Sequence, residues 1–156
     1  MDFMPSNWLT ESLLRNFKVG SVVYTWCDFC EPAKNKYLVV VSLDPSLLVL
    51  VVNTNINQFY FDRGQEGFHV LVPVAEHQFL AHDSYACCVE AIEAFDLTYM
   101  KAQVVEKYND FHRGHLTSKC LVDVYRAVLA QGVMRRGLKR QILSSLEAEL
   151  YSLVSD

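Results

Sequence analysis

The chain has 156 residues, of which 51% are hydrophobic and 21% are charged. This length fits one domain, and this composition excludes a disordered chain because enough apolar surface is present to form a core. The formal net charge of −4 excludes a surface that is basic overall, so any contact with phosphate needs a local basic patch.

The chain lacks the features of a membrane or secreted protein. The longest apolar run, Leu47–Val52, has the length of a strand, whereas a membrane-spanning helix needs roughly 18 apolar residues. The first residues carry Asp2 and lack an apolar core followed by a cleavage site, which argues against a secretory signal. Five cysteines are an odd number and do not suit a framework of paired disulfides, so we predict reduced thiols in a cytoplasmic protein. Because no apolar run is long enough to span a bilayer, we also predict no membrane partner.

The first half of the chain is predicted to form a helix and then strands. Ser6–Phe17 has apolar residues three and four positions apart, and Ser6 is suited to cap the first turn. Strands are predicted at Ser21–Trp26, Tyr37–Leu43 and Leu47–Asn53. Asp44-Pro45-Ser46 has the composition of a tight turn, so we expect the second and third strands to form a hairpin.

Both hairpin strands are almost wholly apolar. We therefore expect both faces to be buried, one by closure of a β-barrel and the other by helices. A polar loop, Cys27–Lys36, precedes the hairpin and another, Asn55–Gly67, follows it, and loops of this length are often functional. Further strands are predicted at Phe68–Val74 and Ser84–Phe95.

The last third of the chain changes to helical spacing. Helices are predicted at Leu97–Tyr108, from Thr117 or Ser118 to Ala130, and at Leu138–Leu153. Strands followed by helices, without βαβ alternation, indicate an α+β fold. We predict a single domain, 1–156, with an antiparallel β-barrel over 20–95 and a helical extension over 97–156 packed on it.

The central part of the chain carries motifs in a characteristic order. Gly20-Ser21-Val22-Val23-Tyr24 opens a strand that leads into a loop, a second strand runs over 36–42, and a third ends in Asn53-Thr54. The segment 77–85 reads His-Gln-Phe-Leu-Ala-His-Asp-Ser-Tyr. These motifs resemble the PemK/MazF-like family, the small SH3-like barrels of bacterial toxin–antitoxin systems, and the segment 77–85 resembles an uncharacterised PemK-like subgroup.

The resemblance implies an SH3-like barrel that cleaves single-stranded RNA without metal, binds an antitoxin protein and pairs as a homodimer. In the family, an acidic residue of the first loop, an Arg and a Thr are proposed to carry the cleavage. These places correspond to Glu31, Lys36 and Thr54. The chain has Lys36 for the Arg and Tyr37 for a Pro. Because lysine cannot make the planar two-point contact of arginine with phosphate, we expect weakened activity.

Two classes of function stay open on this reading. In the first, the protein is an endoribonuclease in which Glu31 takes the proton of the 2′-hydroxyl and Lys36 stabilises the phosphorane charge. In the second, it is a non-catalytic barrel that binds a protein partner or nucleic acid. The substitution at Lys36 and the net negative charge favour the second. No cofactor is predicted for either.

A second candidate site lies in the segment 77–85. His77, His82 and Asp83 could provide metal ligands, or Asp83 could orient a histidine as a base. However, Asp83-Ser84 directly before a strand is also typical of a structural turn. We favour the structural role.

Two remaining sequence patterns are weaker evidence of a functional site. The basic residues on and before the last helix could bind phosphate or an acidic partner, or could solubilise a helix face. These residues are Arg135, Arg136, Lys139 and Arg140. Cys27-x-x-Cys30 lacks a second pair with matched spacing, so we predict no zinc site.

Overall fold

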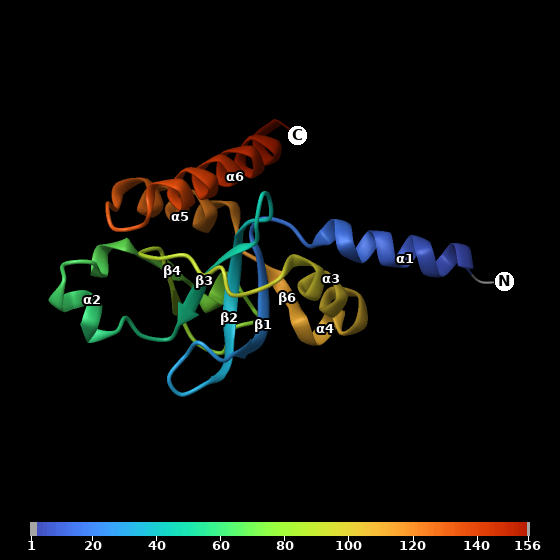
Figure 1. Ribbon diagram of the computed structural model, residues 1–156, viewed down its shortest axis with the longest axis horizontal. Helices are drawn as coiled ribbons and strands as arrows, with labels where there is room; N and C mark the ends of the chain where they lie inside the picture. The colour runs from blue at the N-terminus through green and yellow to red at the C-terminus, as the bar shows by residue number, and fades with distance from the viewer. Residues whose placement is uncertain (1–2, 156) are drawn as a thin grey trace.

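The computed structural model describes residues 3–155, which form one antiparallel sheet with helices on both faces (Figure 1). The strands of the sheet are β1 Ser21–Cys27, β2 Lys34–Ser42, β3 Leu48–Asn53, β4 His69–Val72, β5 Ser84–Cys87 and β6 His112–His115. Their order across the sheet is β4-β5-β3-β2-β1-β6. The predicted α+β class and antiparallel sheet are therefore confirmed. Within the described residues the sheet curls into half a barrel, and its edge strands β4 and β6 do not pair with each other.

The α-helices of the described residues include four longer ones that match the predicted helices closely and two short ones that were not predicted. They are α1 Phe3–Asn16, α2 Gln58–Asp62, α3 Leu97–Glu106, α4 Tyr108–Phe111, α5 Ser118–Ala130 and α6 Arg136–Ser155. Because α1 begins at Phe3, Ser6 lies inside the helix and the predicted cap at Ser6 is wrong. Thr117 is the N-cap of α5, where its side chain accepts a hydrogen bond from the backbone N–H of Cys120, as predicted. None of the helices within residues 3–155 combines the length and the apolar character needed to cross a membrane.

The predicted hairpin is confirmed as the centre of the sheet. In the antiparallel pairing of β2 with β3, Val39 lies opposite Leu50 and Val40 lies opposite Val49. Since successive side chains of a strand point to opposite faces, the first pair belongs to one apolar core and the second pair to another. Both faces of the hairpin are therefore buried, as its apolar sequence predicts.

Helices cover both faces of the sheet, so the prediction that barrel closure buries one of them is wrong (Figure 1). Helices α5 and α6 cover one face through Leu121, Val124, Ile142 and Leu146. Helices α1, α3 and α4 contribute to the core on the other face. The residues buried there are Met100 and Val104 of α3, Phe111 of α4, and Phe17, which directly follows α1.

Three strand predictions need correction. Strand β5 is shorter than the predicted Ser84–Phe95, and Ile92 returns to the sheet only through an isolated bridge to Val49. Strand β4 covers the centre of the predicted Phe68–Val74. Strand β6 was not predicted, because His112–His115 is polar and includes a glycine. It pairs with the first residues of β1, so a segment that lies between two predicted helices completes the sheet.

Candidate functional site

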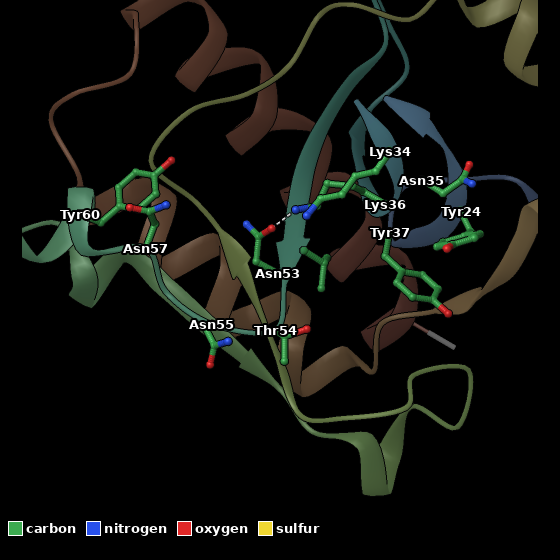
Figure 2. A pocket seen from close by; sticks show the side chains of 11 residues that line it. Tyr24, Lys34, Asn35, Lys36, Tyr37, Asn53, Thr54, Asn55, Asn57 and Tyr60 are labelled. Atoms are coloured by element: carbon green, nitrogen blue, oxygen red, sulfur yellow. Dashed lines mark hydrogen bonds between the residues drawn. The ribbon is translucent and has the colours of Figure 1, made fainter. Parts of the chain in front are cut away.

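A hollow of about 660 Å³ opens where β2 begins and β3 ends (Figure 2). We call it the strand-end pocket. Its lining consists of Tyr24, Lys34, Asn35, Lys36, Tyr37, Val52, Asn53, Thr54, Asn55, Asn57 and Tyr60. Among the described residues that line it, two are lysines, four are asparagines, three are tyrosines and none is acidic. In a chain of net charge −4, this is a locally cationic surface rich in hydrogen-bonding groups.

Lys36 lies in the middle of this pocket. The β2–β3 pairing brings it beside Asn53, and its Nζ donates a hydrogen bond to Oδ1 of Asn53 (Figure 2). Burial lowers the pKa of Lys36 from its usual value, and the charge of Lys34 acts in the same direction, while Cys30 opposes it. A lysine held by a neighbouring amide is better positioned to meet an anion than a freely rotating one, since less side-chain freedom is lost on binding.

An aromatic wall forms one side of the pocket. The rings of Tyr24 and Tyr37 are 4.7 Å apart between centroids, and the Tyr37 hydroxyl donates a hydrogen bond of 3.0 Å to the carbonyl of Phe79. The guanidinium of Arg113, on β6, lies 5.7 Å from the Tyr24 ring and 5.9 Å from the Tyr37 ring. Sequence reasoning missed Arg113, because only the unpredicted pairing of β6 with β1 brings it here.

The structure brings two of the three residues matched to the toxins into the pocket. Lys36 and Thr54 both line it, whereas Glu31 is exposed in the loop between β1 and β2 and does not. The carboxylate that shares a hollow with Lys36 is that of Glu90, in a smaller space of about 200 Å³ that Tyr60 also lines. There the Tyr60 hydroxyl donates to Oε1 of Glu90 at 3.5 Å, and burial raises the pKa of Tyr60.

The histidine segment forms a structural connection between β4 and β5. His77 is buried, with Nδ1 2.8 Å from the carbonyl of Pro73 and Nε2 accepting the backbone N–H of Thr117 at 3.2 Å. With one ring nitrogen donating and the other accepting, His77 is the neutral imidazole. Asp83 accepts the backbone N–H of Val74 at 2.9 Å, and His82 is exposed. These contacts support the structural role that we favoured for His77 and Asp83.

The cysteines lie mostly in the core. Cys27 is buried and Cys30 is half-buried, and burial raises the pKa of Cys27 to about 11. A thiol with a raised pKa is a poor metal ligand and a poor nucleophile at neutral pH. Over residues 3–155, no group of three or more His, Cys, Asp or Glu side chains is arranged to hold a metal ion.

The four basic residues of the predicted cluster have different surroundings. Arg135 lies 3.4 Å from Glu93, and Nζ of Lys139 donates to the carbonyl of Gln131 at the C-terminal end of α5. Arg136 and Arg140 are exposed. None of the four basic residues lines the strand-end pocket, so the cluster is a separate surface.

No protein-family model matches the chain, and neither a curated protein nor a solved structure is significantly similar to it. The relation to the PemK/MazF-like family therefore stays a prediction from the sequence motifs. What the protein does has to be argued from the strand-end pocket itself.

Proposed function

We propose that the protein binds single-stranded RNA in the strand-end pocket. The observation that carries the proposal is the composition of the pocket: Lys34 and Lys36 lie among amides and tyrosines, and the described lining includes no carboxylate. Lysines neutralise phosphates, and this contact supplies most of the sequence-independent affinity for nucleic acids. Within an acidic protein, such a local concentration of positive charge directs an anionic ligand to one place.

The other lining residues favour a single strand over a duplex. Tyrosine rings provide platforms on which bases stack, and bases are available for this only when they are not stacked within a double helix. Asparagine amides both donate and accept hydrogen bonds, so they can pair with the free edges of bases. Tyr24, Tyr37 and Tyr60 supply the rings, and Asn35, Asn55 and Asn57 supply exposed amides.

We also propose that the protein is related to the SH3-like toxin barrels. This relation is supported by the curled antiparallel sheet and by the presence of Lys36 and Thr54 in one pocket. With this relation we also propose a cytoplasmic location, an antitoxin-like protein partner and pairing as a homodimer. The buried free cysteines, among them Cys87 and Cys88, suit a reducing compartment.

A weak endoribonuclease is the second candidate function. It is favoured by the hollow that Lys36 shares with Glu90, because RNA cleavage needs a base near the 2′-hydroxyl and a cation near the phosphate. Glu31 remains the base that the family resemblance implies, and it would have to approach the pocket by movement of its exposed loop. We rank binding above cleavage because the described lining of the strand-end pocket includes neither a carboxylate nor a histidine that could act as the base.

Fluorescence anisotropy with labelled single-stranded RNA tests the proposal. The double variant Lys34→Gln/Lys36→Gln is expected to bind more weakly. The slope of log affinity against log salt should become shallower by roughly 1.4, since each neutralised phosphate of a single strand contributes about 0.7. Lys119→Gln is the matched control, because Lys119 is an exposed lysine on α5 outside the pocket. Unchanged affinity in the double variant, or no binding by the unaltered protein, would refute the proposal.

The same RNA, analysed on a denaturing gel, separates the two candidate functions. Binding without cleavage supports the module. Cleavage that is lost in Glu90→Gln, and kept in Glu31→Ala, would establish an enzyme whose base is the carboxylate beside Lys36. Cleavage lost in Glu31→Ala and in Thr54→Ala would instead establish the chemistry that the resemblance to the toxins implies.

A further inference from the structure

We infer that the RNA site continues beyond the strand-end pocket into a second hollow beside β1, where Trp26 and Tyr99 receive further bases. This inference rests on the proposed function and extends it to the length of the ligand. The second hollow has a volume of about 440 Å³ and lies between β1 and helix α3. We call it the β1 groove.

The two hollows adjoin each other. Tyr24 and Asn35 line both of them, so a ligand leaving the strand-end pocket past these side chains enters the β1 groove. The groove is open because of the strand pairing. In the described part of the chain, β6 pairs with β1 only from Ser21 to Val23, which leaves the rest of β1, including Trp26, without a neighbouring strand on that side.

The groove has the chemistry of a base-stacking surface. Trp26 is 56% exposed and Tyr99 is 49% exposed, and both line the groove, so their rings are accessible to a base that enters it. Gln103 adds an amide that can donate and accept hydrogen bonds. Lys107 and Asp110 give the groove one charge of each sign, so it suits neutral bases better than phosphates.

The two hollows therefore bind different parts of one RNA strand. The lysines of the strand-end pocket hold phosphates, and the aromatic residues of the β1 groove stack the bases that follow. A ligand of one nucleotide can occupy only one of the hollows. Affinity should consequently rise steeply once the strand is long enough to fill both, and Trp26 should contribute only beyond that length.

A length series of oligouridylates tests this inference, with roughly two, four, six and eight nucleotides, which begins below the smallest site size of about four nucleotides found in single-strand-binding folds. The experiment uses Trp8→Phe as background, because Trp26 is then the remaining tryptophan of the chain. Stacking of a base is expected to quench Trp26 fluorescence with the longer strands. Trp26→Ala should weaken binding of these strands at least about fivefold and leave the shortest unchanged.

Two further variants define the control. Trp26→Phe keeps a ring and should retain most of the affinity for long strands, while Tyr151→Ala removes another exposed ring, on α6, and should change nothing. If Lys34→Gln/Lys36→Gln weakens binding but Trp26→Ala binds every length like the unaltered protein, the β1 groove is refuted and the strand-end pocket stands. If no oligouridylate binds the unaltered protein, the proposed function fails and the inference fails with it.

Discussion

His112 is a buried histidine at the junction of α1, β1 and β6. Its Nε2 lies 3.0 Å from the hydroxyl oxygen of Ser21, and its ring stacks on Tyr108 with centroids 4.9 Å apart. The ring of His115 lies 4.8 Å away. Burial, together with the neighbouring His115, lowers the pKa of His112 to about 4. His112 is therefore neutral in the folded protein at neutral pH.

This low pKa predicts a loss of stability in mild acid. An unfolded histidine has a pKa near 6.5, so between pH 6.5 and about 4 the unfolded chain binds more protons at His112 than the folded one. The free energy of unfolding should fall as the pH is lowered through this window, by at most about 3 kcal/mol from this residue. Urea unfolding at a series of pH values measures it.

Two histidine variants test whether His112 causes this loss of stability in mild acid. His112→Phe keeps a ring against Tyr108 and should be less stable at pH 7, because the contact with Ser21 is lost. Its stability should nevertheless change less between pH 6.5 and pH 4 than that of the unaltered protein. His82→Gln alters an exposed histidine and should keep the original pH dependence. An equally steep dependence in His112→Phe would show that another group is responsible.

At the scale of elements, the connection between β4 and β5 packs against β6. A Cβ atom added at Gly114 would lie 2.7 Å from Cδ2 of Phe79, so the glycine is required by the close approach of this ring. Phe79 in turn accepts the Tyr37 hydroxyl through its carbonyl and lies 5.8 Å from the His77 ring. The segment 77–85 therefore holds the aromatic wall of the strand-end pocket in place.

Gly114→Ala should lower the free energy of unfolding by about 1–3 kcal/mol, the usual cost of forcing extra atoms into a packed contact. Gly67→Ala is the control, because a Cβ there meets no atom within 4 Å. Phe79→Leu should relieve the clash, so the double variant with Gly114→Ala should lose less stability than the sum of the two single variants. Simple additivity in chemical denaturation would contradict the contact.

At the scale of the whole molecule, α6 is an integral layer of the fold. Ile142 and Leu146 are fully buried in the core that α5, α6 and the sheet share, as the predicted apolar stripe of this helix implies. Leu138 and Leu150 pack at its margin. Removal of α6 would leave one face of the hairpin open to solvent.

A chain that ends at Gln131 is expected to aggregate, since a large contiguous apolar surface is then exposed. In the full chain, Leu146→Ala should cost about 2–5 kcal/mol of unfolding free energy. Leu129→Ala, at an exposed position of α5, should cost less than about 0.5 kcal/mol. Size-exclusion chromatography and thermal unfolding measure these effects. A shortened chain that stays monomeric with an unchanged melting temperature would show that α6 is an independent appendage.

Local patterns determined most of the elements. The turn at Asp44-Pro45-Ser46 and the apolar strands beside it predict the hairpin, and Thr117 before an apolar stripe predicts the start of α5. These signals are readable because they depend on residues a few positions apart. By contrast, β6 has no strand pattern of its own and is extended because it pairs with the first residues of β1.

The sequence by itself determined the α+β class, the hairpin buried on both faces, and the presence of Lys36 and Thr54 at neighbouring strand ends. The tertiary structure alone decided that helices cover both faces, that Arg113 joins the wall of Tyr24 and Tyr37, and that Glu90 rather than Glu31 shares a hollow with Lys36. The physical reason is distance along the chain. Propensity and periodicity act within an element, whereas a site assembled from several strands depends on packing between segments that no local pattern relates.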